Sequence, residues 1–405
     1  MEKVAFLYAT FPRSTETFVR RELKALWARG LEPQAYSLWG GQENWNVIKI
    51  ELFNKFKLLS LFIWIPYWAF LRPRSFLITL RHMWGKECPN TQNFNETFLG
   101  LGFALVEAHH FEKKGYDLIH AVWATMPATA ALAIYRLTGI PFSMGAHAYD
   151  LFRKGGDWLL EEKLRFARFV RTSSQSSANR LLARGVDKRR IKLIRRGLEK
   201  FSNRDTSTFA EQTPELKLIA IGRLVPKKGY FYMMEIIFEL SKQSIPFTLQ
   251  IIGEGRLRKE ISAEIKRFGL EENVTLCGAR TENEVRELLL TQDVMLFTGI
   301  VDSHGDRDGI PNVIPEAMDA GCLVLSSVNA GASEAFIDEV SGFSLDPVCP
   351  GEWVKRLQEF YEDSGSFKDV RCNAMKHVRQ NFDIKKTASL LHQSIQKTVQ
   401  EDQLL

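Results

Sequence analysis

The chain runs twice through an alternation of strand-like and helix-like segments, and one polar stretch separates the two series. Residues 4–9 form a continuous apolar run, typical of a strand buried on both faces of a parallel sheet. The polar stretch, 198–215, is the best linker in the sequence. Two such series predict an α/β protein with two doubly wound domains that face each other across a cleft. We assign 1–200 and 201–379 to the two domains, and expect a helix at about 380–405 to pack back on the first.

Local signals place the elements of each series. Ser14 can cap a helix that runs to about residue 29, with Glu16 at the positive end of its dipole. The first series has further expected strands at 34–38, 118–123, 141–145, 169–172 and 191–194, and helices at 128–137 and 176–184. The second has expected strands at 216–221, 247–252, 274–277, 294–297 and 323–326, and helices at 229–242, 256–268, 282–290 and 312–320.

Composition excludes several classes of protein. The 405 residues are 45% hydrophobic and 25% charged, which rules out a disordered, collagen-like or coiled-coil chain. The net charge of +6 is too small for a dedicated nucleic-acid binder, but it suits small anionic ligands or an anionic membrane surface. The five scattered cysteines include no CxxC pair, and the amino terminus resembles a strand rather than a signal peptide. We therefore expect a cytoplasmic protein without a disulfide framework or a cysteine zinc site.

One apolar segment, 58–71, raises the question of a membrane. As a helix its 14 residues would measure about 21 Å, against about 30 Å for a hydrocarbon core, and Pro66 would kink it, so it does not span. Lysines and arginines flank it, and it contains Trp64 and Tyr67, whose rings suit the headgroup level. Two readings stay open: residues 55–74 contact an anionic membrane surface, or they form a buried helix pair whose aromatic side chains are core.

Two cations flank the first strand-to-helix turn of the second domain. Arg223 follows the strand expected at 216–221, and Lys228 precedes the next helix. Because a helix amino terminus favours anions, two cations beside it make a site suited to a diphosphate. The alternative is that Lys227 and Lys228 form a solvated surface pair.

Two carboxylates lie eight residues apart near the end of the second series. Asp308 sits in a glycine-containing loop, and Glu316 lies about one turn into the following helix. They can accept hydrogen bonds from hydroxyls at two ends of an elongated ligand, and the amides of Asn312 and Val313 can meet phosphates between them. The alternative is a helix-capping Asp308 and an ordinary surface Glu316.

These residues resemble motifs of the family-4 retaining glycosyltransferases, which have the GT-B fold of two Rossmann-like domains. The pair of carboxylates is similar to the family's E-x7-E region, and Arg223-x4-Lys228 resembles its diphosphate clamp. Residues 145–150, GAHAYD, resemble its HAxD segment. Residues 11–18, FPRSTETF, resemble the FPxxSETF opening of a subset that acts in bacterial exopolysaccharide and colanic acid assembly. The motifs extend to about residue 342, so the resemblance covers nearly the whole chain.

The resemblance implies a role for each matching residue around the donor sugar. Glu316 would bind the ribose hydroxyls. Asp308 would face the hydroxyls of the donor sugar, with Gly309 and Ile310 lining the same pocket. His147 would approach the sugar near its reactive end from the opposite domain, where it would position groups and stabilise charge, unless it is a satisfied structural histidine.

Further roles follow for the phosphates and the base. Gly253 would lie at the nucleotide side, and Arg280 would lie against the base, although an exposed helix-entry residue is the alternative for Arg280. Glu334 would orient a lysine or the phosphates, with a surface glutamate as the alternative. The diphosphate would be held by Arg223, Lys228 and the amides of Asn312 and Val313.

Two positions depart from the family pattern. Asp308 stands where the family has Glu, so its carboxylate falls about 1.5 Å short unless the loop moves in, and misplacement by about 1 Å can cost ~100-fold in rate. In the segment that resembles GGxxE, Ala330 replaces the first glycine, whereas Glu334 is kept.

The resemblance implies a retaining hexosyltransferase that moves a sugar from a nucleotide-sugar donor to a polysaccharide or lipid-linked glycan acceptor. No cofactor and no metal are expected, since cations and a helix start can serve the leaving group and the chain has no His/Cys ligand cluster. We expect it in the cytoplasm or at the inner face of the membrane. The alternatives are a catalytically silent nucleotide-sugar-binding scaffold and a sugar-nucleotide epimerase.

Overall fold

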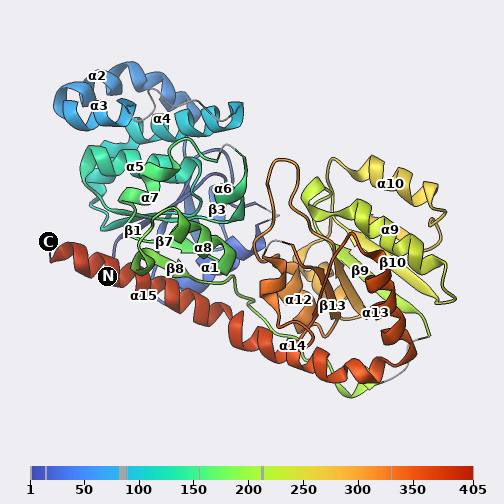
Figure 1. Ribbon diagram of the computed structural model, residues 1–405. Helices are drawn as coiled ribbons and strands as arrows, with labels where there is room; N and C mark the ends of the chain where they lie inside the picture. The colour runs from blue at the N-terminus through green and yellow to red at the C-terminus, as the bar shows by residue number, and fades with distance from the viewer. Residues whose placement is uncertain are drawn as a thin grey trace. The chain divides into compact units, whose positions relative to one another are not determined.

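The computed structural model describes residues 2–13, 16–81, 88, 90–154, 156–210, 214–329 and 331–404. The chain forms two compact units (Figure 1). The first unit combines Met1–Arg195 with Ile384–Leu405, and the second is Arg196–Asp383.

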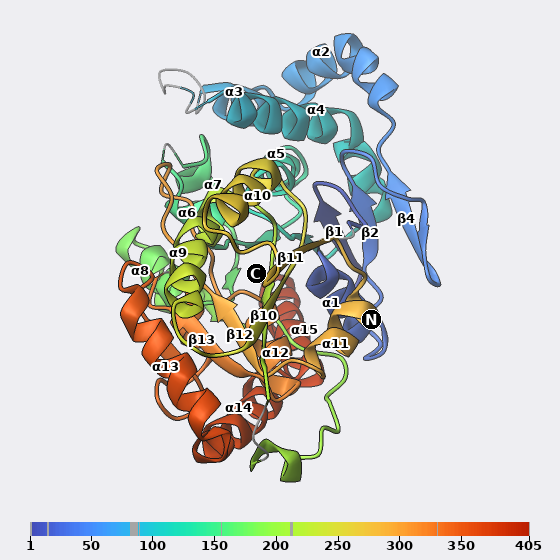
Figure 2. The ribbon, with the colours of Figure 1, turned by 90° about the vertical axis from the view of Figure 1, so that its right-hand side faces the viewer.

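The first unit is built on a sheet of eight strands in the order β3-β4-β2-β1-β5-β6-β7-β8. All neighbouring pairs are parallel except β3 and β4, which are antiparallel. Figure 2 shows β1, β2 and β4 side by side. The strands are β1 (Val4–Tyr8), β2 (Gln34–Ser37), β3 (Asn44–Trp45), β4 (Ile48–Leu52), β5 (Leu118–Ala121), β6 (Phe142–Gly145), β7 (Val170–Thr172) and β8 (Ile191–Leu193).

Helices cover both faces of this sheet. They are α1 (Thr17–Trp27), α2 (Leu61–Leu71), α3 (Pro73–Arg81), α4 (Thr91–Lys114), α5 (Met126–Thr138), α6 (Ala148–Phe152), α7 (Leu160–Phe166), α8 (Gln175–Ala183) and α15 (Ile384–Gln403), with the 3-10 helices η1 (Lys55–Ser60) and η2 (Lys188–Arg190). The helix expected from Ser14 is shorter than predicted: α1 begins at Thr17 and ends at Trp27, while Ser14 and Thr15 lie outside the described residues.

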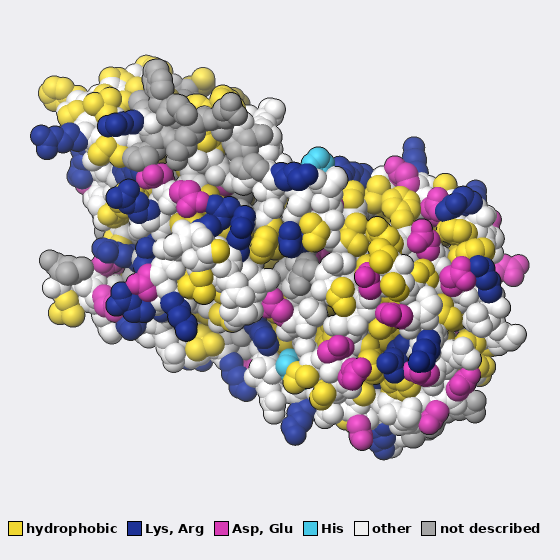
Figure 3. Space-filling view, viewed as in Figure 1, with side chains coloured by type: hydrophobic (Ala, Val, Ile, Leu, Met, Phe, Trp, Pro, Cys, Tyr) yellow, Lys and Arg dark blue, Asp and Glu magenta, His cyan; other side chains and the backbone are white. Residues whose placement is uncertain are grey.

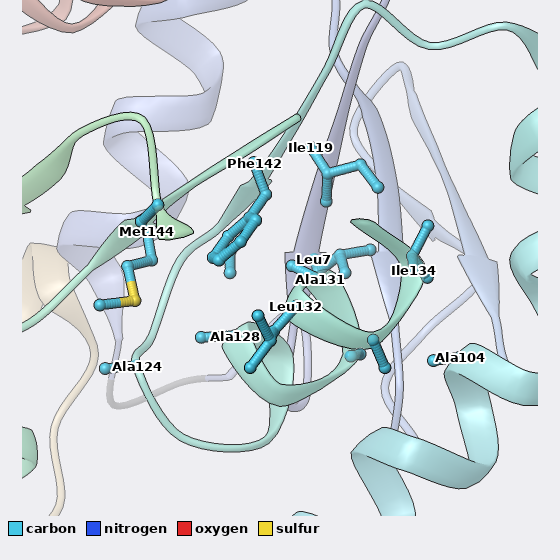
Figure 4. Close-up of a cluster of buried hydrophobic side chains, with 14 of the residues drawn as sticks. Leu7, Ala104, Ile119, Ala124, Ala128, Ala131, Leu132, Ile134, Phe142 and Met144 are labelled. Carbon is cyan, nitrogen blue, oxygen red and sulfur yellow. The ribbon is translucent and has the colours of Figure 1, made fainter. Parts of the chain in front are cut away.

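Successive side chains of β1 point to opposite faces of the sheet and so belong to two separate hydrophobic clusters. Val4, Phe6 and Tyr8 pack with α1 and with Leu391 and Ile395 of α15. The intervening side chains of β1 face α4 and α5 on the other side of the sheet. Figure 4 shows this second cluster, which includes Leu7, Ile119 and Phe142 of three neighbouring strands with Ala104, Ala128 and Leu132 of the helices.

A buried ion pair joins β7 to α1. Arg171 and Glu22 are both buried, and Nη2 of Arg171 lies 2.7 Å from Oε2 of Glu22. Nε of the same guanidinium donates to the carbonyl oxygen of Ile194. Arg171 of β7 therefore holds α1 through Glu22 and the backbone just after β8 through the carbonyl of Ile194.

The second unit has a sheet of six parallel strands in the order β11-β10-β9-β12-β13-β14. Its strands are β9 (Leu216–Ile221), β10 (Phe247–Ile252), β11 (Val274–Gly278), β12 (Val294–Phe297), β13 (Leu323–Ser327) and β14 (Phe343–Leu345). Its α-helices are α9 (Tyr230–Ser241), α10 (Arg258–Arg267), α11 (Glu282–Leu289), α12 (Val313–Asp319), α13 (Pro350–Glu362) and α14 (Lys368–Asn381). Short 3-10 helices are η3 (Ser207–Ala210), η4 (Pro226–Lys228), η5 (Ala332–Ala335) and η6 (Ser364–Phe367).

This sheet also buries both faces. Leu218 and Ala220 of β9 pack with α9, α10 and α13, whereas Ile219 and Ile221 pack with α11, α12 and α14. The polar stretch that follows β8 is attached to this unit, because the Leu198 amide donates to the carbonyl of Phe382.

Helix α2 is only thinly covered. Trp68 is its one buried residue, and Phe62 and Phe70 are 75% and 90% exposed. The reading of this segment as a buried helix pair is therefore wrong for the exposed side chains of α2, although Trp68 is buried and Trp64 packs against the core. Across the described residues, no helix combines the length and apolar character needed to cross a membrane.

Candidate functional site

The turn after β9 is held by close backbone contacts. Gly229 has a φ of 68°, and a Cβ atom there would lie 1.9 Å from the carbonyl oxygen of Thr298. Gly253 has a φ of 141°, and its Cβ would lie 2.0 Å from the carbonyl oxygen of Gly222. Only glycine fits either position, since both the conformation and the contact exclude a side chain. The ends of β9, β10 and β12 are thereby locked together at the carboxyl edge of the sheet.

Lys228 points across this edge toward the loop that follows β12. Its ammonium lies 2.8 Å from Oδ2 of Asp308 and 4.8 Å from the ring centre of Phe297. Arg223 projects from the same turn and is exposed. Among the residues that the structure describes, the Arg223 guanidinium makes no ion pair or hydrogen bond. One cation of the predicted pair is thus paired with a carboxylate and the other is open to an anion.

Lys227 is a member of this cluster that the sequence did not single out. Its side chain is 8% exposed, and its ammonium lies 3.1 Å from Oδ2 of Asp306 and 3.4 Å from Oδ1 of Asp308. The alternative of a solvated lysine pair is therefore wrong for Lys227. Its position next to Lys228 is the sole sequence signal, and which lysine turns inward depends on the geometry of η4.

The two lysines set the charge of Asp308. Burial would raise the pKa of its carboxyl, but Lys228 and Lys227 outweigh burial and hold that pKa below its ordinary value. Asp308 is therefore an anion at neutral pH. The positive charges of the two lysines are matched by the negative charges of Asp306 and Asp308. Because Asp308 already pairs with Lys228, an incoming anion must compete with Asp308 for this lysine.

The loop between β12 and α12 presents the remaining predicted residues. Glu316 lies in the first turn of α12, after Gly309 and Ile310, which are both partly buried. The first bonds at this helix are donated by the Ile314 and Glu316 amides. The amides of Asn312 and Val313 have no acceptor among the described residues. These amides are thus available to a ligand.

Neighbouring strand ends complete the edge. The Gly331 amide donates to the carbonyl of Asp308, and a Cβ on Gly331 would lie 2.7 Å from the carbonyl carbon of Gly309. Glu334 lies one turn later in η5, while Ala330 falls outside the described residues. On the other side, Gly253 donates to the carbonyl of Gly278, and Arg280 is exposed just beyond β11. The second-unit residues therefore all follow the carboxyl ends of neighbouring parallel strands.

His147 belongs to the first unit, directly before α6. Its Nδ1 lies 3.3 Å from the hydroxyl of Ser173, and its ring meets Trp123 edge to face at 5.3 Å. Trp123 in turn contacts the ring of Phe18. The FPRSTETF and GAHAYD segments are thus joined through one tryptophan at the carboxyl edge of the first sheet.

Asp150 fixes the backbone of His147. Its Oδ2 accepts a hydrogen bond of 2.8 Å from the His147 amide. Burial raises the pKa of Asp150 to about 7, although that amide, Lys163 and Arg153 act in the opposite direction.

Within the described part of the chain, no three His, Cys, Asp or Glu side chains lie close enough together to hold a metal ion.

Two family models match the chain and together span most of it. The model described as Glycosyltransferase Family 4 matches residues 15–200, and that described as Glycosyl transferases group 1 matches residues 203–377. The two matches identify the chain as a glycosyltransferase, and its fold of two Rossmann-like domains is of the GT-B type. The chain belongs to the family-4 glycosyltransferases.

Two relatives of this chain are also named as glycosyltransferases. A protein of Salmonella typhimurium, provisionally named colanic acid biosynthesis glycosyltransferase WcaL, is 26% identical over 94% of this chain and 96% of its own length. The amylovoran biosynthesis glycosyltransferase AmsK of Erwinia amylovora is 30% identical over 41% of this chain and 40% of its own length.

Solved structures share the fold. HepE of Anabaena, crystallised with UDP, has a TM-score of 0.71 at 19% identity, covering 98% of this chain and 100% of that one. Sucrose-phosphate synthase of Thermosynechococcus elongatus has a TM-score of 0.70 at 14% identity, covering 98% and 99%.

Proposed function

We propose that this glycosyltransferase is a retaining hexosyltransferase. It moves a sugar from a nucleotide-sugar donor to a polysaccharide or lipid-linked glycan acceptor, without a metal ion. The observation that carries the proposal is the edge of the second sheet, where the turn after β9 holds both Lys228 and an Arg223 that is open to an anion. The names of the relatives support a role in exopolysaccharide biosynthesis. The UDP and UDP-glucose bound in HepE crystals make uridine nucleotides the first donors to test.

In this mechanism the bond between the anomeric carbon and the diphosphate breaks, which leaves negative charge on the departing phosphate. Arg223 and Lys228 stabilise that charge, the kind of interaction that usually contributes most to catalysis. The amides of Asn312 and Val313 add neutral donors to the same phosphates. The acceptor hydroxyl attacks the same face of the sugar, and its proton passes to an oxygen of the leaving phosphate. His147 positions groups near the sugar and stabilises charge there.

Asp308 has two successive partners in this scheme. Without donor its carboxylate binds Lys228 and Lys227. When the diphosphate takes Lys228, Lys227 still holds one carboxylate oxygen, and the other turns to a hydroxyl of the donor sugar. Glu316 binds the ribose hydroxyls, with Gly253 and Arg280 on the base side and Gly309, Ile310 and Glu334 lining the loop.

Nucleotide release tests the proposal. The wild-type protein, supplied with UDP-, GDP- or ADP-sugars and no acceptor, should slowly release nucleotide from one donor class, and Lys228→Met should not. Release should be unaffected by EDTA, and when an acceptor is added, proton NMR of the glycoside formed should show the anomeric configuration of the donor. A donor that raises the melting temperature without any release would instead indicate a silent nucleotide-sugar-binding scaffold. Neither binding nor release with any donor would refute the proposal.

We also propose that the enzyme works at the cytoplasmic face of the membrane, where a lipid-linked acceptor would be presented. The thin covering of α2 supports this location.

A further inference from the structure

Helix α2 is apolar on all sides, yet most of it is exposed. A helix without a polar face is expected in a protein core or in contact with lipid. Here one side lies on α4, where Nε1 of Trp68 donates to the carbonyl of Leu105 and Leu58 of η1 contacts Gly102. The other sides have no cover within the described part of this unit. The exposed large hydrophobic side chains of η1, α2 and α3 are Phe56, Leu59, Phe62, Ile63, Ile65, Tyr67, Phe70, Leu71, Leu77 and Ile78.

This apolar face, formed by η1, α2 and α3, is firmly attached to the first unit. Lys57, before α2, forms an ion pair of 2.6 Å with Glu107, and Arg72, just after α2, forms one of 2.8 Å with Glu112. Both carboxylates belong to α4, so ion pairs fix each end of α2 to the long helix beneath it. The exposure of the face is therefore a property of an anchored element.

The charges within the segment that forms the face are of one sign, and two of them pair with Glu107 and Glu112 of α4. From Phe53 to Arg81 the sequence holds five Lys or Arg residues and no Asp or Glu. Two of the cations, Arg74 and Arg81 of α3, are exposed and make no ion pair or hydrogen bond among the described residues. Figure 3 shows hydrophobic side chains gathered at the α2–α3 end of the first unit, beside Lys and Arg side chains.

We propose that the face formed by η1, α2 and α3 inserts into the headgroup region of an anionic bilayer. The exposed Phe, Leu and Ile side chains reach the acyl boundary, and Arg74 and Arg81 bind lipid phosphates. Trp64 and Tyr67 are amphipathic rings suited to the interface between them. A second copy of this chain is the wrong occupant, because a symmetric contact would bring cations against cations. The inference names the surface behind the proposed membrane location, and it does not require the proposed activity.

Flotation of the full chain with vesicles tests the insertion. The wild-type protein should float with phosphatidylcholine vesicles that contain phosphatidylglycerol, and much less with pure phosphatidylcholine. Phe62→Ser/Phe70→Ser should weaken the partition coefficient by about 100-fold or more, because two large apolar side chains lose their burial. Phe231→Ser, at an exposed phenylalanine of α9 in the second unit, is the matched control and should float like the wild type.

The charge component has its own variant. Arg74→Ser/Arg81→Ser should weaken binding to phosphatidylglycerol vesicles by about 30-fold, since each cation near an anionic surface contributes about 5-fold. Lys259→Ser/Lys266→Ser, on exposed positions of α10, removes the same charge elsewhere and should change nothing. Circular dichroism should show every variant folded, because all the substituted side chains are exposed.

Three results would overturn the inference. One is no flotation with either vesicle at low salt. Another is equal flotation of the wild-type protein and Phe62→Ser/Phe70→Ser. The third is a wild-type dimer by analytical ultracentrifugation that becomes a monomer in this variant, without vesicle binding by either. Donor-dependent nucleotide release, measured without lipid in the same variants, reports separately on the proposed function and should equal that of the wild type.

Discussion

Replacing Asp308 by Asn should tighten the binding of a nucleoside diphosphate while it slows sugar transfer. The carboxylate and the Lys228 ammonium are 2.8 Å apart. At an effective dielectric constant of about 20, a charge pair at this distance has a Coulomb energy of about 6 kcal/mol. A diphosphate that binds Lys228 must replace this interaction, and the asparagine variant removes the competitor.

Only part of this energy would appear in the measured affinity, because water solvates the freed ammonium in the variant. We expect a decrease in Kd of about 10-fold, which corresponds to about 1.4 kcal/mol. Transfer should fall by about 10- to 100-fold, because a charge-assisted hydrogen bond to the sugar, worth about 1.5–3 kcal/mol, becomes a neutral one.

Calorimetric titration of UDP, or of whichever diphosphate the wild type binds, measures the affinity, and nucleotide release in the presence of acceptor measures the rate. Asp306→Asn is the matched control, because Asp306 pairs with Lys227 at 3.1 Å from the same loop. It should leave the diphosphate Kd within about 2-fold, because Asp308 still competes for Lys228 in this variant. Unchanged or weaker binding in Asp308→Asn, or equal tightening in Asp306→Asn, would refute the competition between carboxylate and phosphate.

Three further predictions concern affinity, pH and stability. Glu316→Gln should weaken nucleotide binding by about 10-fold or more with little effect on an added inorganic diphosphate, since it removes a charge-assisted bond to the ribose; equal weakening of both ligands in calorimetry would contradict this. Burial raises the pKa of Asp150 from 3.8 to about 7, so between these two pH values the folded protein keeps a proton that the unfolded chain releases. The free energy of unfolding of the wild type should therefore fall as the pH rises toward about 7. The difference in free energy of unfolding between Asp150→Asn and the wild type, measured by urea unfolding, should therefore shift by about 2–3 kcal/mol in favour of the variant from about pH 5 to about pH 8. A difference that does not change with pH would contradict the titration of Asp150. Arg171→Met should lower the free energy of unfolding by about 3–5 kcal/mol because it leaves Glu22 buried without its cation, whereas Arg189→Met, at a side chain that is 90% exposed, should change it by less than about 0.5 kcal/mol.

The sequence predicted the strands of the second unit well because they are continuous aliphatic runs bounded by polar or glycine residues. The bounds of β9, β10 and β12 are those predicted, and the carboxylates and cations fall on the expected loops and helix starts. Strands β3, β4 and β14 were not predicted: β3 and β14 have only two and three residues, and the apolar residues of β4 alternate with Lys49 and Glu51. Their pairing depends on neighbours that no local pattern reveals.

Contacts between side chains that are far apart in the sequence could not be predicted from it. Nothing in the pattern distinguished the inward Lys227 from Lys228, or showed that Asp308 binds both lysines. These choices depend on η4 and on the glycine contact with Thr298, which join segments some 70 residues apart. The cleft between the domains and the approach of His147 to the donor stay predictions.

The central claim is that Arg223 and Lys228 receive the diphosphate of a sugar nucleotide. Calorimetric titration of UDP, GDP and ADP into the wild type and into Arg223→Ala/Lys228→Ala tests it directly, with Lys259→Ala/Lys266→Ala as the charge-matched control. At least one diphosphate should bind the wild type and the control alike, and bind the Arg223/Lys228 variant about 100-fold more weakly or worse, because two charge-assisted contacts are lost. Undiminished affinity without these two cations would contradict the account.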